Sequence, residues 1–272
     1  MKRKWLILLG GIVIVLVFIY GLINKNFFIS THKNAPLTND VAVVSHNLPT
    51  TKDAPLAPKG DPLVNVLSAP NNFLLNVPFT SQAPFGVWDP IHNDACEEAA
   101  LVMAQHWIDG HLINATVADK EILDLISWED KNWGNQYELT AERIAALGKE
   151  FFKIKNINIF SDPTVGDIKA ELAKGNLIIV PVAGQVLSNP YYRSPGPIYH
   201  VLVIKGYDEK NFITNDPGTR HGEGYGYPYQ VLLNAIHDWP YPVPDFGINV
   251  AKEVQAQKIL TGGRVMLIIS KN

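Results

Sequence analysis

The chain has 272 residues, of which 47% are hydrophobic and 18% are charged, and its formal net charge is −3. This composition is typical of a globular protein, and the slightly acidic balance gives no reason to expect nucleic-acid binding. A single cysteine, Cys96, excludes an intrachain disulfide, a thiolate-rich zinc site and an iron–sulfur cluster.

The N-terminal stretch predicts a membrane anchor. Lys2, Arg3 and Lys4 form a basic cluster within residues 1–4, and an uncharged apolar run occupies residues 5–24. About 20 such residues span a bilayer core as a helix, and the basic cluster favours the cytoplasmic side, which places the rest of the chain outside. The alternative is a cleaved signal peptide and a secreted protein, but no pair of small residues marks a cleavage point. We therefore expect a single-pass protein of the cell membrane.

Residues 25–70 have the composition of a disordered linker. No aromatic residue occurs between residues 31 and 70, where prolines recur and the few charges balance. Such a segment cannot bury enough apolar surface to offset the entropy lost on ordering. Residues 71–272 are long enough to build a core, and we expect them to form one domain.

Residues 71–272 carry helical patterns mostly in their first half and strand patterns mostly in their second half. Helices are predicted where apolar residues recur three or four positions apart, at residues 95–108, 116–128, 140–147 and 164–174. Thr116 is a candidate cap of the second helix, and Thr164-x-x-Asp167 resembles a capping box at the start of the fourth. Strands are predicted from apolar, β-rich runs at residues 73–79, 177–182, 199–206, 211–215 and 265–269. Because most helices precede the strands, we expect an α+β fold with an antiparallel sheet.

Cys96 lies at the start of the first predicted helix. Asp94 is a natural N-cap for that helix, because its carboxylate can accept hydrogen bonds from free backbone N–H groups. Cys96 then falls in the first turn, where these N–H groups and the helix dipole favour a thiolate. Most free cysteines are instead small hydrophobes packed in a core. A catalytic role therefore requires a base and a group that orients the base.

His200 is the histidine whose position best suits a base. It opens the apolar run 200–206, and a polar residue at the mouth of a buried strand needs a partner. A turn near Asp208 predicts a hairpin in which facing residue numbers sum to about 417, so His200 lies opposite residues 216–218. Asp216 can there hold one imidazole nitrogen, although Asp-Pro-Gly is also a common turn. Linker or solvated surface positions are expected for the other histidines, His32, His46, His92, His106, His111, His221 and His237.

An acyl-transfer site also needs hydrogen-bond donors for the oxyanion that develops on the substrate. The backbone N–H of Cys96 is one candidate. The side-chain amide of Gln82, just after the first predicted strand, is the other. Taken alone, Gln82 has the ordinary character of a surface polar residue.

These residues, in this order, resemble a known family. The stretches that carry the resemblance are Val77-Pro78-Phe79-x-x-Gln82, Cys96 at a helix start, His200-Val-x-Val-x-x-Gly206-Tyr207-Asp208 and Asn215-Asp216-Pro217. Together they are similar to the cysteine-peptidase family thirty-nine-like domain of the papain clan, named for peptidases that remove bacteriocin leaders after a double glycine. The resemblance implies a papain-like α+β fold with the catalytic helix packed on an antiparallel sheet. It also implies Cys96 as nucleophile, His200 as base, Asp216 as orienter and Gln82 as oxyanion donor.

The chain departs from this family in one place. Glu97 and Glu98 follow Cys96 where the family commonly has Gly-Pro. Two carboxylates suit a helix N-terminus, but they raise the pKa of the thiol if they lie close to it. No ATP-binding P-loop pattern is present in the sequence, so the transporter-fused version of the family is not expected.

The leading functional prediction is a membrane-tethered, extracytoplasmic thiol hydrolase that cleaves peptide or isopeptide bonds of a peptide or protein substrate. We expect a monomer without cofactor or metal, and an acyl transferase would use the same residues. One alternative is a non-catalytic domain that binds peptides or cell wall through Trp88, Trp133 and Tyr191. Another is a metal site built from His92, Cys96, His200 and Asp216, because the first two stand four residues apart.

Overall fold

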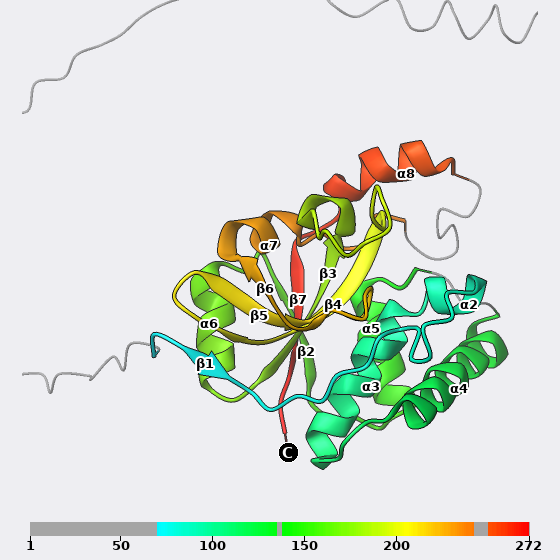
Figure 1. Cartoon of the computed structure of the whole chain (residues 1–272), viewed down its shortest axis with the longest axis horizontal. Coiled ribbons are helices and arrows are strands. Elements are labelled where there is room, and N and C mark those ends of the chain that lie inside the picture. The colour runs from blue at the N-terminus through cyan, green and yellow to red at the C-terminus, as the bar shows by residue number, and fades with distance from the viewer. Residues whose placement is uncertain (1–69, 135–137, 242–249, 272) are drawn as a thin grey trace, which may run out of the picture. The chain divides into compact units, whose positions relative to one another are not determined.

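The computed structural model describes residues 70–134, 138–241 and 250–271 (Figure 1). The predicted anchor at residues 5–24 and the linker, apart from Pro70, lie outside the described residues. Within the described ranges, no helix combines the length and the apolar character that crossing a bilayer requires. The membrane anchor therefore stays a prediction.

The helices agree with the sequence patterns at their centres and differ at their ends. The helix α6 (Val165–Ala173) begins with the predicted capping box, in which the Thr164 side chain and the Asp167 carboxylate accept from each other's backbone N–H. Asn114, rather than the expected Thr116, is the N-cap of α4 (Ala115–Trp133). In chain order the helical elements are α2 (Pro90–Asn93), α3 (Cys96–Asp109), α4 (Ala115–Trp133), α5 (Ala141–Glu150), α6, the 3-10 turn η1 (Gly184–Leu187), α7 (Tyr229–Ala235), α8 (Lys252–Lys258) and the 3-10 turn η2 (Ile259–Thr261).

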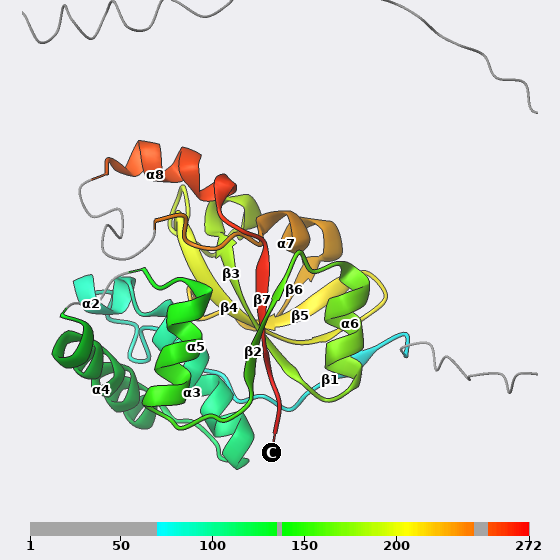
Figure 2. The same cartoon turned by 180° about the vertical axis from the view of Figure 1, so that it is seen from behind.

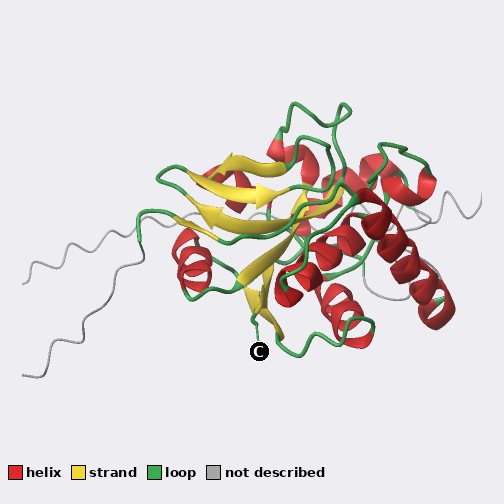
Figure 3. Ribbon diagram, turned by 60° about the horizontal axis from the view of Figure 1, so that its bottom comes forward, coloured by secondary structure: helices red, strands yellow, loops and turns green. Residues whose placement is uncertain are grey.

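The strands form one antiparallel sheet in the order β2-β7-β3-β4-β5-β6, with the short β1 paired to β4. Figure 3 shows this twisted sheet with helices on both of its sides. The strands are β1 (Phe73–Leu74), β2 (Ile157–Ser161), β3 (Leu177–Ala183), β4 (Tyr199–Tyr207), β5 (Asn211–Asn215), β6 (Glu223–Pro228) and β7 (Val265–Ile269).

The central strands β3 and β4 are buried on both faces, because every residue of each strand is buried. Side chains alternate between the faces of a strand. Accordingly, Val201 and Val203 pack in the cluster with α3, α4 and α5, whereas Leu202 and Ile204 pack in the cluster with α6 and α7. Figures 1 and 2 show these two groups of helices on opposite sides of the sheet. The domain thus has three layers.

Three local predictions about the strands were wrong or incomplete. The strand expected at residues 73–79 is confined to Phe73–Leu74, because Val77 N donates to Leu75 O across a tight bend and the chain then leaves the sheet. The strands β2 and β6 were not predicted, since neither carries a clear apolar run: four of the five β2 residues are exposed, and Gly224 and Gly226 interrupt β6. The predicted fold class is confirmed: an α+β domain in which the helix that begins at Cys96 packs on an antiparallel sheet.

Candidate active site

Cys96 is the first residue of α3, as the sequence predicts, but the predicted cap is wrong. The N-cap is Ala95, which makes no side-chain capping hydrogen bond, and Asp94 is instead the C-cap of α2. The reason lies just upstream. Asp89 and Pro90 start a short helical turn of their own, so Asp94 ends one helix directly before α3 begins. The thiol is 4% exposed.

The thiol of Cys96 donates a hydrogen bond to a carboxylate. Its Sγ lies 2.9 Å from Glu97 Oε2, and the backbone N–H of Leu139 donates to Glu97 Oε1, also over 2.9 Å. Burial raises the pKa of the Cys96 thiol well above its usual value, and the negative charges of Glu97, Glu138 and Glu98 raise it further. Glu97 and Glu98 thus lie close enough to the thiol to oppose thiolate formation, the condition stated for them from the sequence.

His200 and Asp216 are brought together as the hairpin argument predicts. The distance from His200 Nε2 to Asp216 Oδ1 is 2.8 Å, and both side chains are buried. The hairpin pairs β4 with β5 through Val203 and Asn215, with a bulge between Ile204 and Gly206. By alternation His200 shares a face with Val182, its cross-strand neighbour, on the side of α6 and α7.

Asp216 is held by more donors than a simple orienting residue requires. Its Oδ2 accepts hydrogen bonds from Tyr192 Oη at 2.6 Å, Tyr227 Oη at 2.6 Å and Asn189 Nδ2 at 3.2 Å. Its Oδ1 accepts from His200 and from the backbone N–H of Gly218, the latter at 3.0 Å. Burial acts to raise the pKa of Asp216. The charge of His200 and the hydrogen bonds to Asp216 outweigh burial, so the pKa of Asp216 is lowered.

The sequence did not indicate these supporting side chains. Tyr227 lies in β6, a strand that its glycines hide, and Asn189 and Tyr192 lie in the segment between η1 and β4. The sequence offered only a general rule, that a buried carboxylate needs hydrogen-bond donors. That need does not say which residues supply them.

Gln82 reaches the backbone just before Cys96. Its Nε2 donates to His92 O at 2.8 Å and to Asn93 O at 2.9 Å, so both amide hydrogens are in use. Its own backbone N–H donates to Pro217 O at 3.0 Å. Gln82 therefore links the turn that precedes Cys96 to the turn that follows Asp216. One amide hydrogen has to leave its carbonyl before Gln82 can donate to an oxyanion.

Hydrogen bonds within the described residues connect the segments that carry the four predicted residues, but they do not join the thiol of Cys96 to the imidazole of His200. Hydrogen bonds of Gln82 join the turn before Cys96 to Pro217, and the residue before Pro217 in the chain, Asp216, is bonded to His200. Between the thiol and the imidazole no hydrogen bond is present in the described part of the chain, where the thiol's bond goes to Glu97.

The metal alternative is not supported by the geometry. His92 Nδ1 lies 2.9 Å from Asp89 Oδ1, and its Nε2 lies 3.2 Å from Asp119 Oδ1, so the imidazole is directed at two aspartates rather than at Cys96. Among residues 70–134, 138–241 and 250–271, no group of three or more histidine, cysteine, aspartate or glutamate side chains is arranged to hold a metal ion.

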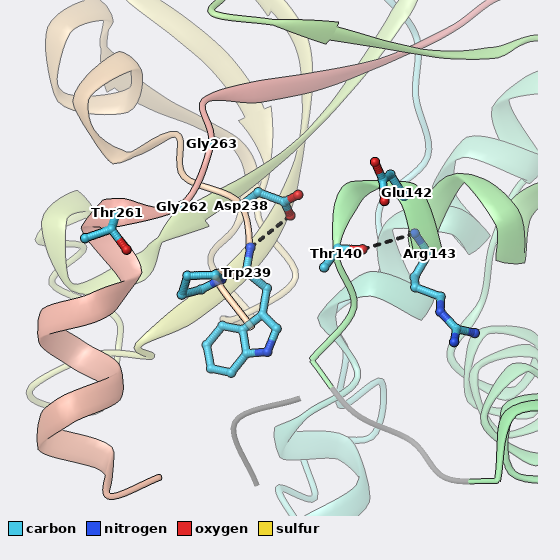
Figure 4. Close-up of a pocket in the computed structure, with 9 residues that line it drawn as sticks. Thr140, Glu142, Arg143, Asp238, Trp239, Thr261, Gly262 and Gly263 are labelled. Carbon is cyan, nitrogen blue, oxygen red and sulfur yellow. Dashed lines mark hydrogen bonds between the residues drawn. The ribbon is translucent and has the colours of Figure 1, made fainter. Parts of the chain in front are cut away.

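A cavity of about 580 Å³ lies beside the start of α5, and none of the four predicted residues lines it (Figure 4). Asp238 Oδ1 stands at its wall and accepts hydrogen bonds from the backbone N–H groups of Ala141 and Trp239, both at 2.9 Å. Burial raises the pKa of Asp238 to about 6. The ring of Trp239 also packs on Tyr199, the residue before His200, with centroids 5.3 Å apart.

Comparison with known proteins places these features in a family context. The model of the peptidase C39-like family matches residues 74–241, a span that contains all four predicted residues. A comparison with curated proteins finds no match. Among solved structures, a C39-like peptidase from Bacillus anthracis is similar at 14% sequence identity with a TM-score of 0.44, over 74% of this chain and 98% of that one.

We predict that Gly218→Ala displaces the imidazole of His200. A Cβ at residue 218 would lie 2.9 Å from His200 Cε1 and 3.0 Å from Nε2, closer than side-chain atoms approach each other. Relief of this overlap lowers the free energy of unfolding by about 1–3 kcal/mol. It also breaks the hydrogen bond from His200 to Asp216, and NMR detects this as loss of the protected imidazole N–H signal. Gly226→Ala is the control, because its Cβ meets Asn211 at an ordinary 3.5 Å. An unchanged imidazole signal in Gly218→Ala would contradict the prediction.

We also predict an acid-dependent loss of stability from Asp216. Its pKa is lower in the folded than in the unfolded chain, so its contribution is complete above the unfolded pKa and is lost as pH falls through the folded one. Tyr192→Phe or Tyr227→Phe removes a donor to the carboxylate, lowers the free energy of unfolding by about 1.5–3 kcal/mol and starts the acid loss at a higher pH. Urea unfolding from neutral to acid pH measures both effects.

Tyr225→Phe is the matched control for these variants. Its ring packs on Tyr227 at a centroid distance of 4.7 Å, but the Asp216 carboxylate accepts from Tyr192 and Tyr227 and not from Tyr225. If Tyr225→Phe shifted the acid limb as far as Tyr227→Phe does, the explanation through donors to Asp216 would fail.

Proposed function

Because the chain belongs to the peptidase C39-like family, we propose that it is a thiol hydrolase that cleaves peptide or isopeptide bonds with Cys96 as the nucleophile. The observation that carries this proposal is the hydrogen bond between His200 and Asp216, with 2.8 Å between Nε2 and Oδ1, tied through Pro217 and Gln82 to the turn before Cys96. A buried imidazole with an ionised partner is what a thiol nucleophile needs as a base.

In the proposed mechanism, Asp216 fixes the tautomer of His200. An ionised Asp216 accepts a hydrogen bond from Nε2–H, which leaves Nδ1 as the nitrogen that can take a proton from the thiol. The thiolate of Cys96 attacks the substrate carbonyl, and the imidazolium returns the proton to the leaving amine. Water then releases the acyl group. An amine in place of water would make the protein an acyl transferase with the same residues.

The oxyanion of the tetrahedral intermediate would be stabilised at the start of α3. The first N–H groups of a helix have no partner within the helix, so the backbone N–H of Cys96 is suited to this role. Gln82 supplies the second donor in this proposal, by moving one amide hydrogen from the carbonyl of His92 or Asn93. Its hydrogen bonds also fix the turn that leads into Cys96.

We further propose that the domain is tethered to the outer side of the cell membrane. The support is the basic cluster at residues 1–4, the uncharged apolar run at residues 5–24 and the proline-containing linker at residues 25–70. We predict that the full-length chain is recovered in the membrane fraction of cells. Recovery of the uncleaved chain in the soluble fraction would contradict a tether.

A non-catalytic binding domain is the second candidate, and one observation favours it. The thiol is bonded to a carboxylate, and burial with nearby charge raises its pKa, which is the opposite of an activated nucleophile. Trp88 and Tyr191 are 39% and 52% exposed and are available for a ligand, whereas Trp133 packs on Trp128. A binding domain would retain peptides without releasing any product.

We predict a hierarchy of losses when turnover of a peptide library is measured for single variants. Cys96→Ala abolishes turnover, because no other thiol exists in the chain. His200→Ala nearly abolishes it, since the thiol loses its proton acceptor. Gln82→Ala slows it roughly 100- to 1000-fold through loss of an oxyanion donor. Wild-type turnover by Cys96→Ala would falsify the thiol mechanism.

The matched control for the base is His221→Ala. The ring of His221 stacks on Tyr191 at a centroid distance of 4.5 Å and lies in an exposed turn. We expect near-normal turnover for this variant. Equal inactivity of His221→Ala and His200→Ala would show that the base has been misassigned.

A further inference from the structure

Glu97 touches the reacting sulfur, and the proposed mechanism gives it no task. Its Oε2 is 2.9 Å from Cys96 Sγ, and its Oε1 is held at 2.9 Å by the backbone N–H of Leu139. The side chain is 1% exposed, so water does not compete for the thiol proton. A hydrogen bond to an ionised acceptor is about twice as strong as one between neutral groups.

The surroundings of this pair are mostly acidic. Ionisation of Cys96 next to an ionised Glu97 would place two negative charges at hydrogen-bond distance, in a site where burial already penalises charge. The titratable groups that act on the pair come from each element packed against it: Glu98 from α3, Glu129 from α4, Glu138 from the segment before α5, Tyr199 and His200 from β4, and Lys252 of α8 through Glu138.

We propose that Glu97 is a further residue of the reaction centre, and that its carboxylate holds Cys96 as a protonated, resting thiol which must leave Glu97 before His200 can deprotonate it. The release breaks the hydrogen bond between Sγ and Glu97 Oε2. The proton stays on sulfur during the release and then passes from Sγ to the imidazole, while Glu97 keeps its charge.

Two observations separate Glu97 from the neighbouring acids. Glu97 is the carboxylate that accepts the thiol hydrogen bond, and no other acid within residues 70–134, 138–241 and 250–271 accepts one from Cys96. Glu98, the next residue, is equally buried, but its carboxyl group is paired with that of Glu129 and not with the thiol. The contact, and not acidity in general, therefore distinguishes Glu97.

The test is the rate of alkylation of Cys96 by iodoacetamide, a neutral probe, in the detergent-solubilised full chain. The chain has one cysteine, so mass spectrometry reports on Cys96 alone. Glu97→Gln removes the charge and keeps the shape. A like charge at this distance shifts a pKa by about 1–3 units, and the weaker nucleophilicity of a more acidic thiol offsets about half of each tenfold gain in thiolate. We expect alkylation at neutral pH to be roughly 3- to 30-fold faster.

Glu98→Gln is the matched control, because it makes the same carboxyl-to-amide change one residue further along α3 without touching sulfur. We expect a much smaller acceleration for it. An unchanged or slower rate in Glu97→Gln would overturn the proposal, and so would an equal acceleration in Glu98→Gln.

A measurement on the unaltered chain covers the case in which Glu97→Gln does not fold. The pH midpoint of alkylation in the folded chain is compared with the midpoint of the same chain in urea. The proposal requires a higher midpoint in the folded chain, to which burial of the thiol also contributes, and an equal or lower midpoint overturns it. The proposal rests on the proposed function only for the role of His200. Alkylation needs no turnover, so a failed hydrolase test and a failed Glu97 test are distinguishable.

Discussion

The buried carboxylate of Asp216 is the constraint on which the geometry of the site depends. A charge removed from water is tolerated only where several donors replace the water. The donors to Asp216 come from β4, β6, the segment after η1 and the turn at Gly218. These parts of the chain must therefore converge on one point. The orientation of His200 is a consequence of that convergence, because the imidazole is one of the donors.

The three-layer architecture explains why the nucleophile and the base reach the site from different directions. Cys96 packs with the helices on one face of the sheet, whereas Val182, opposite His200, belongs to the other face. Hydrogen bonds of Gln82 connect the turn before Cys96 to Pro217, the residue after Asp216. This arrangement lets the base be rigidly held while the thiol is bonded elsewhere, to Glu97.

The sequence predicted those parts of the structure that local patterns determine. The helix at Cys96, the capping box at Thr164 and the hairpin that pairs His200 with Asp216 all follow from spacing within short segments. The cap at Asp94 was wrong because a second helical turn precedes α3, and no periodicity reveals one turn of helix. The tyrosine donors were missed because contacts between distant segments depend on tertiary packing, which one sequence does not encode as a pattern.

The contrast between Asp216 and Glu97 shows how donor number decides the state of a buried carboxyl group. Burial acts to raise the pKa of both. Five hydrogen bonds and the charge of His200 reverse that effect for Asp216, whereas one thiol and one backbone N–H do not reverse it for Glu97, whose pKa remains raised. Asp216 therefore keeps its charge through its donors, whereas burial opposes the charge of Glu97. The site thus combines a base of constant orientation with a thiol that has to exchange its hydrogen bond to Glu97 before it reacts.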